Sequence, residues 1–304
     1  MKWLLRVFGV LVVVMVVVYL TLAAMSQPRP DHPFFADRPD VLVIAHQGGE
    51  RLWPSNTMYA FERAVAMGVD VLEMDVHSSV DGVLVVSHDE TVDRLTDGSG
   101  TIKEMSFADL QALDAGYRWT DDDGATFPYR GAGAQIPALE EVFEAFPDML
   151  MNIEIKQAEP PIVEPFCELI RRYDKQDQVL VGSFHAETMV DFRRTCSEVA
   201  TSGTEPEIRP FFVLNTLFLG AVYRPPAEAF QVPEYSGNLH VVTRRFVEGA
   251  QRHNVDVHVW TVNETADMER MLDLGVDGII TDRPDRLMEV LGREMGDWRL
   301  EIGD

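Results

Sequence analysis

The sequence predicts an α/β fold, a TIM or (β/α)8 barrel, preceded by one apolar N-terminal helix. After residue 40, short apolar runs typical of buried strands alternate with helical patterns, and such repeated βα units form a parallel sheet. The chain has 304 residues, 46% of them hydrophobic, which suits one large barrel with a sizeable core. Before residue 40, an uncharged apolar run is followed by a proline-rich stretch.

The apolar run Val7–Met25 predicts a single membrane-spanning helix. At 1.5 Å of rise per residue it just crosses a hydrocarbon core ~30 Å thick. Lys2 and Arg6 precede the run, and the positive-inside bias then places the rest of the chain outside the cytoplasm, on the periplasmic or cell-surface side of the membrane. A cleaved signal peptide is the alternative, because Leu22-Ala23-Ala24 offers small residues near a cleavage point. The length of the run favours retention.

The chain accordingly divides into an anchor at residues 1–25, a spacer at 26–40 and a barrel domain at 41–304. Prolines make the spacer semi-rigid, at Pro28, Pro30, Pro33 and Pro39. Within the domain, residues 90–137 lack a βα pattern and predict a small insertion. Residues 211–238 are also irregular and predict an elaborated loop over one face of the barrel.

The remaining elements follow from periodicity. Strands are expected at residues 41–46, 69–76, 83–89, 149–155, 179–184, 255–262 and 278–281. Helices are expected at residues 139–146, 161–173, 187–196, 244–253 and 266–274. A further helix is expected after Ser55, a residue type that caps helix N-termini.

The composition restricts the partners and the compartment. A formal net charge of −24 argues against nucleic acid and against an anionic membrane surface as electrostatic partners. An anionic substrate would then need local positive charge, most simply a divalent cation. Cys167 and Cys196 match no metal motif, and two buried free thiols are expected, although an oxidising compartment permits a disulfide.

Acid–base side chains follow most of the predicted strands. They are His46, Asp75, His88, Glu154 with Lys156, His185, Asn263 and Asp282. Because barrel active sites collect at the carboxyl ends of the strands, these side chains are expected at one mouth.

Glu73 and Asp75 stand two apart on a strand, so both side chains point into the same space. Two carboxylates there repel unless a cation or a shared proton relieves them. Oxygen ligands favour Mg²⁺ or Ca²⁺ over Zn²⁺. Glu154 and Lys156 repeat the spacing, and we expect Glu154 to complete the metal site and Lys156 to hold a phosphate oxygen. A buried salt bridge between these two residues is the alternative.

His46 and His88 are the expected general acid and base. Imidazole titrates near neutral pH, so one ring can take a proton from the attacking oxygen while the other protonates the leaving alkoxide. The attacking group is either water or a substrate hydroxyl that forms a cyclic phosphate. These groups together predict metal-assisted cleavage of a phosphate ester.

The motifs together resemble the glycerophosphodiester phosphodiesterase family, within the phosphatidylinositol-phosphodiesterase-like barrel superfamily. The resemblance covers nearly everything after residue 40. It rests on His46-Gln47-Gly48-Gly49 with Asn56-Thr57, Leu72-Glu73-Met74-Asp75-Val76, Ser87-His88-Asp89, Thr96-Asp97-Gly98-Ser99-Gly100, Ile136-Pro137-Ala138-Leu139-Glu140-Glu141, Asn152-Ile153-Glu154-Ile155-Lys156, Val259-Trp260-Thr261-Val262-Asn263 and Asp277-Gly278-Ile279-Ile280-Thr281-Asp282-Arg283-Pro284.

The resemblance implies a TIM barrel with an insertion after the second histidine, and a Mg²⁺- or Ca²⁺-dependent hydrolase of glycerophosphodiesters or lysophospholipids. Its catalytic pair would be His46 and His88, its metal ligands Glu73, Asp75 and Glu154, and its substrate contacts Gln47, Lys156 and Trp260. The family commonly has Arg where this chain has Gln47 and Glu where it has Ser55. Glu50 with Arg51, or Arg283, are the candidates to replace that phosphate contact.

Three functions follow from these observations. The leading one is an anchored phosphodiesterase that releases an alcohol and sn-glycerol 3-phosphate. The second is a lysophospholipase D acting on a lipid still in the membrane, for which the apolar residues Phe211, Phe212 and Leu217–Leu219 are suited. The third is an inactive binding protein, which the presence of His46, His88 and Glu73 disfavours. Oligomeric state is open.

Overall fold

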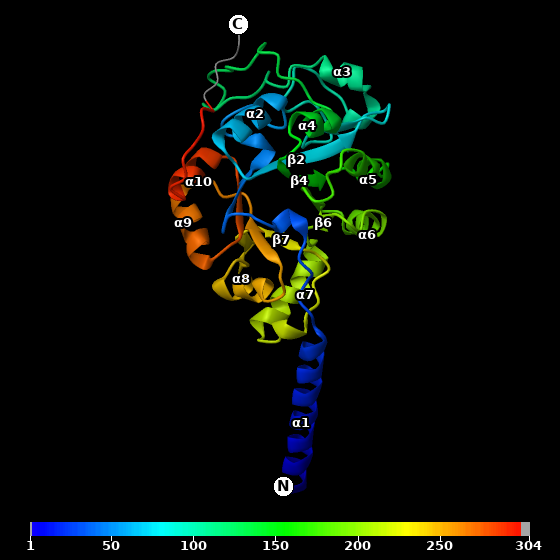
Figure 1. Ribbon diagram of the computed structural model, residues 1–304, viewed down its shortest axis with the longest axis vertical. Helices are drawn as coiled ribbons and strands as arrows, with labels where there is room; N and C mark the ends of the chain where they lie inside the picture. Colours follow the sequence, from blue (N-terminus) through cyan, green and yellow to red (C-terminus); the bar gives the residue numbers. More distant parts are fainter. Residues whose placement is uncertain (1, 299–304) are drawn as a thin grey trace.

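The computed structural model describes residues 2–298, which form a nearly closed parallel barrel with helices outside it and one long helix projecting from its side (Figure 1). Residue 1 of the predicted anchor (1–25) and residues 299–304 of the predicted domain (41–304) lie outside the described residues. The α/β barrel class predicted from the alternating runs is confirmed.

Eight parallel strands form the barrel in the described part of the chain, and neighbours in space follow their order in sequence. They are β1 (Leu42–Ala45), β2 (Val71–Ser78), β4 (Leu150–Ile155), β5 (Val179–Gly182), β6 (Ala200–Thr201), β7 (Ala229–Val232), β10 (Asp256–Val259) and β11 (Gly278–Thr281). β1 pairs with β11 from Leu42↔Gly278 to Ala45↔Thr281. A bridge between Ser202 and Ala229 joins the β6 side to β7. First and last strands are therefore neighbours, and the strand ends form one ring.

A helix follows each barrel strand and covers its outer face (Figure 1). The helices are α2 (Met58–Met67), α4 (Leu139–Ala145), α5 (Val163–Arg172), α6 (Ala186–Thr195), α7 (Glu205–Thr216), α8 (Arg244–Gln251), α9 (Thr265–Leu274) and α10 (Pro284–Val290). The expected cap of α2 is wrong. Thr57 rather than Ser55 accepts a hydrogen bond from the Ala60 amide, at 3.2 Å, because Asn56, with φ 56°, keeps the chain non-helical until that point.

β3 (Leu84–Val86) is not a barrel strand, which corrects the expectation for residues 83–89. It pairs antiparallel with β2, as in Val76↔Val86, because the short turn after Ser78 returns the chain directly alongside β2. His88 therefore follows a hairpin and not a parallel strand. The insertion contains η3 (Ile102–Glu104) and α3 (Phe107–Gln111), and it encloses a small core of its own.

The expectation of an irregular loop at residues 211–238 is wrong. The segment holds the end of α7, the turn η4 (Gly220–Val222), barrel strand β7 and β8 (Tyr235–Ser236), which pairs with β9 (Leu239–His240). Interrupting prolines hid this pattern. The sequence also did not reveal β6, because two residues are too few to show a period.

Two apolar layers hold the barrel together. Leu72, Met74 and Val76 point from β2 toward the helices, and all three are fully buried, as their alternation with Glu73 and Asp75 predicted. Inside the barrel, the first residues of the strands pack on Phe34 of η1 (Pro33–Phe35). The proline-rich segment therefore lies against the amino-terminal end of the barrel, opposite the expected site.

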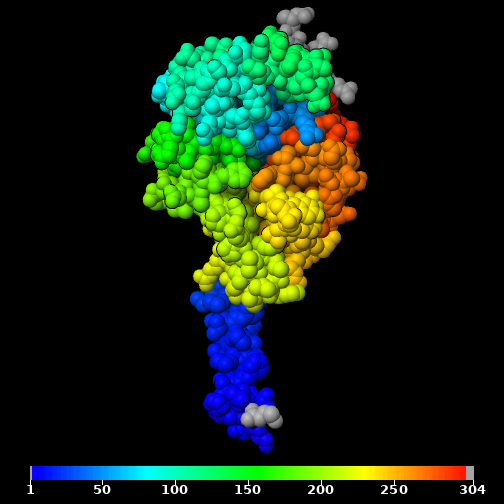
Figure 2. Space-filling model, turned by 180° about the vertical axis from the view of Figure 1, so that it is seen from behind, coloured from blue at the N-terminus to red at the C-terminus, as the bar shows by residue number. Residues whose placement is uncertain are grey.

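α1 (Lys2–Met25) has no buried residue and stands away from the barrel (Figure 2). It is long and apolar enough to cross a membrane, a property that signal sequences share. Its carboxyl-terminal end meets the barrel at η4, where the Ser26 hydroxyl donates a hydrogen bond to the Tyr223 carbonyl and the Tyr19 hydroxyl donates to the Phe218 carbonyl at 3.5 Å.

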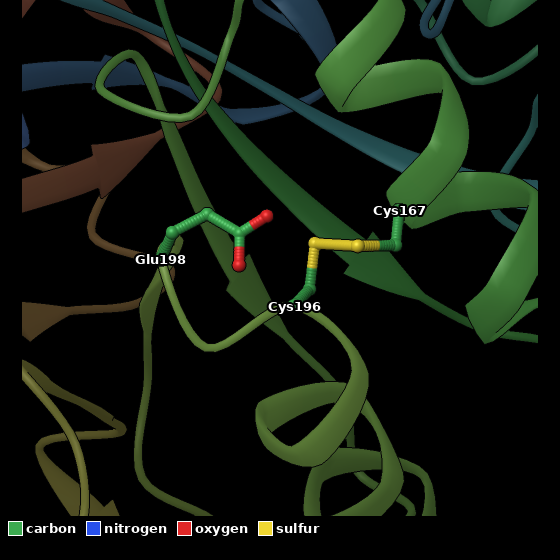
Figure 3. A group of neighbouring side chains, drawn as sticks. All are labelled: Cys167, Cys196 and Glu198. Atoms are coloured by element: carbon green, nitrogen blue, oxygen red, sulfur yellow. A yellow bond between two sulfur atoms is a disulfide. The ribbon is translucent and has the colours of Figure 1, made fainter.

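Cys167 and Cys196 form a disulfide, so the expectation of two free thiols is wrong (Figure 3). α5 and α6 are neighbours in the outer ring, which brings the two Cα atoms to 5.8 Å, within disulfide reach despite a separation of 29 residues. Glu198 lies nearby, but sulfurs that are bonded to each other are not available as thiolate ligands.

Candidate active site

The carboxyl-terminal mouth of the barrel brings together most of the predicted strand-exit residues. His46, after β1, lies 2.5 Å from Asp282, after β11, measured from Nδ1 to Oδ1. Asn263, after β10, donates to the other oxygen of Asp282 at 2.6 Å. Lys156, after β4, lies 3.2 Å from Asp75. His185 is not brought in, because it is exposed at the start of α6.

The sharp turn after His46 allows the chain to enter the mouth. Gly48, with φ 81°, adopts the left-handed conformation that glycine tolerates best. A Cβ atom there would stand 2.8 Å from the Cβ of Ala60 in α2. The turn holds Gln47 over the mouth, where its amide N–H donates to Glu73 Oε2 at 2.7 Å.

Glu73 and Asp75 both face the barrel interior and are buried. The backbone N–H of Gln47 donates to Glu73. The side chain of Asn56 donates to Asp75, with Nδ2 at 2.9 Å from the carboxylate oxygen. Burial first, and then repulsion from Asp75, raise the pKa of Glu73 to about 8. The two carboxylates therefore do not carry two full charges at neutral pH without a further positive group.

Lys156 supplies part of that positive charge. Its ammonium lies 2.9 Å from Glu154 and 3.2 Å from Asp75, and Glu154 is beside Asp75 in the β2–β4 register. Burial alone would lower the pKa of Lys156, but the two carboxylates raise it, so the side chain stays protonated. The pKa of Glu154 is still raised, mainly by burial. Lys156 thus forms the ion pair that the sequence left open, and its predicted contact with phosphate stays a prediction.

Three buried carbonyl oxygens around these carboxylates have no hydrogen-bond partner within the described residues. They are Gln47 Oε1, Asn56 Oδ1 and Asn152 Oδ1. Asn152 is the register partner of Glu73 on β4. Unpaired buried acceptors are costly, and neutral oxygens next to carboxylates are the donor set that Mg²⁺ and Ca²⁺ prefer. The residues present fit a hard divalent cation.

Another group of side chains at the mouth has its possible metal-ligating atoms closer together than Glu73, Asp75 and Glu154 have theirs. Those of His46, Glu50 and Asp282 all lie within 4.8 Å of one another, which is not found for Glu73, Asp75 and Glu154 among residues 2–298. The hydrogen bond from His46 to Asp282 already explains this proximity. We therefore base the cation site on the unpaired oxygens, and the trio Glu73, Asp75 and Glu154 remains a prediction.

Each predicted catalytic histidine has one ring nitrogen held by a carboxylate. Burial alone would lower the pKa of His46, but Glu73 and then Asp282 outweigh it and raise the pKa to about 9. His88 Nδ1 lies 2.8 Å from Asp89 and its ring is partly exposed. A carboxylate on one nitrogen sets the ring orientation, and the other nitrogen of His46, Nε2, lies 3.4 Å from Gln47 Nε2.

Sequence reasoning missed three neighbours of the predicted site. Asp89 orients His88, although its place directly after that histidine was a usable signal. Arg94 lies 2.6 Å from Asp89 and 3.3 Å from Glu50, and no local pattern indicated it. Phe184, 68% exposed, packs edge-on against Trp260 with ring centroids 5.8 Å apart. These two rings form an aromatic wall, and Lys156 Nζ lies 5.6 Å from the Phe184 centroid.

The suggested replacements for the missing phosphate contact differ in availability. Arg283 is bound to Asp285 at 2.6 Å, which turns it away from that task. Arg51 is more exposed and lies 3.7 Å from Asp282. Arg51 and Arg94 are therefore the guanidinium groups at the rim beside the two histidines.

Comparison with known proteins gives a consistent result. Residues 46–286 match the model of the "Glycerophosphoryl diester phosphodiesterase family". A protein of Caldanaerobacter subterraneus subsp. tengcongensis named glycerophosphodiester phosphodiesterase is 36% identical over 259 residues, covering 82% of this chain and 97% of that protein. A human protein named lysophospholipase D is 27% identical over 275 residues, covering 82% of this chain and 85% of that protein.

Solved structures share the fold. A glycerophosphoryl diester phosphodiesterase domain from Mycobacterium tuberculosis superposes with a TM-score of 0.73 at 23% identity, covering 84% of this chain and 99% of that domain. A phosphodiesterase of Oleispira antarctica, solved in complex with the product sn-glycerol-3-phosphate, has a TM-score of 0.64 at 24% identity, covering 82% of this chain and 96% of that one.

Proposed function

The chain belongs to the glycerophosphoryl diester phosphodiesterase family, and from this premise we propose that it hydrolyses glycerophosphodiesters to an alcohol and sn-glycerol 3-phosphate with the help of a divalent cation. The observation that carries the proposal is the mouth itself. Paired carboxylates, unpaired carbonyl oxygens and two carboxylate-held histidines converge on one opening.

The cation, Mg²⁺ or Ca²⁺, would be held by Glu73, Asp75 and Glu154, with the carbonyl oxygens of Gln47 and Asn56 close by. When bound, it supplies positive charge that stabilises the phosphate oxygens of the transition state.

The two histidines move the protons of the reaction. One accepts the proton of the attacking oxygen as the new P–O bond forms. That oxygen belongs either to water, which gives sn-glycerol 3-phosphate directly, or to a neighbouring hydroxyl of the substrate, which gives a cyclic phosphate that water then opens to the same product. The other histidine donates a proton to the leaving alkoxide as the old P–O bond breaks. Asp282 and Asp89 hold His46 and His88 in the orientations that these transfers need. The aromatic wall of Trp260 and Phe184 supports a substrate carrying an apolar group.

A lysophospholipase D activity is the second candidate. It is favoured by the exposed apolar helix α1, which would keep the enzyme beside lysolipids, and by the human relative of that name. The proposed location is a single-pass membrane protein with its catalytic domain outside the cytoplasm. Lys2 and Arg6 before the helix support this orientation, and so does the disulfide, since disulfides persist in oxidising compartments.

Two experiments test the proposal. The purified full chain is assayed on glycerophosphocholine and on lysophosphatidylcholine, with and without added Mg²⁺ or Ca²⁺. Preference for the first substrate supports the leading function, preference for the second supports the alternative, and no turnover of either contradicts both.

The location is tested with protease added to intact cells, or to spheroplasts if an outer membrane is present. The domain should be digested while the mature protein still begins near Met1. A protected domain would overturn the orientation, and a soluble product beginning near Ala24 would identify a signal peptide.

A further inference from the structure

A second concave surface lies away from the mouth, where α1 meets η4, and residues of α7 and α8 also line it. It is an open hollow of about 510 Å³, and we call it the arginine hollow after Arg244, Arg245 and Arg252, which line it. Tyr19 of α1 and Phe218 after α7 complete its apolar side. The hollow is therefore shared between the barrel and the helix proposed to cross the membrane.

The charge of the hollow is opposite to that of the whole chain. The net charge is −24, yet none of the three arginines has a carboxylate within 4.0 Å among residues 2–298. Arg244 donates to the Asp273 carbonyl and Arg245 to the Asn215 carbonyl, at 3.4 Å. Bonds to neutral carbonyls leave the guanidinium charge uncompensated. Glu248 is the one carboxylate in the lining, against three arginines.

The apolar side of the hollow continues onto exposed hydrophobic surface. Leu217 is 60% exposed and Phe218 71% exposed, and the guanidinium of Arg245 lies 3.5 Å from the centroid of the Phe218 ring. Leu217 and Phe218 are continuous with α1, because Tyr19 donates to the Phe218 carbonyl. A phosphate-binding side and a hydrocarbon-binding side therefore share one surface.

The position along α1 matches the headgroup layer of a bilayer. Tyr19 stands roughly 9 Å before Met25 at the rise of an α-helix, and Tyr is enriched where a spanning helix leaves the hydrocarbon core. In both views the end of α1 meets the barrel beside the segment that contains α7 (Figures 1 and 2).

We propose that the arginine hollow binds the phosphate headgroup of one anionic phospholipid of the bilayer that α1 crosses, with its acyl chains along α1, Leu217 and Phe218. This inference rests on the proposed membrane anchoring. Guanidinium groups pair strongly with the phosphate of a headgroup, and the exposed Leu217 and Phe218 beside them offer apolar surface to its acyl chains. The bound lipid fixes the side of the barrel that faces the membrane, with the active-site mouth at a different face. The net charge, which argues against anionic surfaces, does not describe this local cluster.

The test is native mass spectrometry of the full chain in detergent, titrated with phosphatidylglycerol or with phosphatidylcholine of the same acyl chains. We expect one phosphatidylglycerol to be retained with a preference on the order of 10–100-fold. Arg244→Gln with Arg245→Gln and Arg252→Gln should remove that preference. Arg171→Gln with Arg172→Gln and Arg194→Gln, on the far helices α5 and α6, changes the charge equally and should not.

Two measurements keep the test independent of folding and of the proposed enzyme activity. Arg252→Gln alone changes a side chain without a hydrogen bond or ion pair in the described residues, and it should weaken phosphatidylglycerol binding severalfold at an unchanged Tm. Hydrolysis of glycerophosphocholine by the same preparations should be unchanged, so a loss of catalysis and a loss of lipid binding are read separately.

Three results would overturn the proposal. If phosphatidylglycerol and phosphatidylcholine were retained equally, or if neither were retained, the hollow would not be a site for an anionic lipid. Equal losses in the two triple variants would make the effect one of net charge. Displacement of the lipid by an equal concentration of soluble sn-glycerol 3-phosphate would make it a site for a soluble phosphate.

Discussion

The barrel mouth and the arginine hollow are two polar regions of opposite charge, and they are built differently. The mouth places Glu73 and Asp75 on the inner face of a buried strand, where their charge requires a compensating ligand or a proton. The hollow places three arginines on exposed helix surface, where water solvates them until an anion binds. The buried carboxylates of the mouth need a bound cation or proton to be stable. The exposed arginines are stable in water, and they form a binding site only because they lie together beside α1.

Removing divalent cations should give the largest effect and bears on the mouth alone. Without a cation, Glu73 and Asp75 repel each other and the pKa of Glu73 is raised, so the geometry for binding phosphate is lost. We expect a chelator to abolish hydrolysis of glycerophosphocholine and added Mg²⁺ or Ca²⁺ to restore it. Retention of phosphatidylglycerol at the hollow should not change. Full activity in metal-free protein would contradict the metal-ligand assignment.

The histidines of the mouth come next. His46→Ala and His88→Ala should each lower kcat by roughly 10²–10⁴, the usual contribution of a positioned acid or base. The Tm of His88→Ala should change little, because that ring is partly exposed, whereas His46→Ala should lower Tm because the buried Asp282 loses its partner. His185→Ala is the matched control, since His185 also follows a strand but is exposed outside the site. Near-normal kcat of either variant on a substrate with a poor leaving group would remove that residue from the chemistry.

The disulfide belongs to neither region and should affect stability alone. Cys167→Ser with Cys196→Ser should lower the free energy of unfolding by about 2–4 kcal/mol, because the unfolded chain gains conformational freedom. The kcat and the lipid preference should both be retained. Denaturant unfolding of the oxidised protein and the double variant measures the difference. Equal unfolding midpoints would show that the bond does not form or contributes nothing.

The smallest effect is expected at the aromatic wall, where Phe184 is exposed at the mouth. Phe184→Ala should raise KM severalfold for a substrate with an apolar group and leave kcat nearly unchanged, since the ring contacts bound substrate without entering the proton transfers. Phe218→Ala, an equally exposed phenylalanine at the hollow, is the control and should leave KM for soluble substrates unchanged. A fall in kcat for Phe184→Ala at constant KM would contradict a wall function.

Much of the barrel and of its mouth was predictable, because the signals are local. Alternation along 69–76 placed Glu73 and Asp75 on one face and Leu72, Met74 and Val76 on the other, as observed. The failures occurred where the local signal is short or misleading. β6 has two residues, β7 lies among prolines, and the apolar run of β3 forms a hairpin beside β2 instead of a barrel strand.

The sequence by itself determined the fold class, the apolar helix and which polar side chains follow the strands, because strand and helix periods depend on neighbouring residues. Only the tertiary structure decided which distant residues meet. Closure of the ring brings Asp282 to His46 across 236 residues, neighbouring helices bring Cys167 to Cys196, and the contact of α1 with η4 brings Tyr19 beside the arginines of α8. Such contacts depend on the path of the whole chain, which the spacing of apolar residues within one strand or helix does not determine.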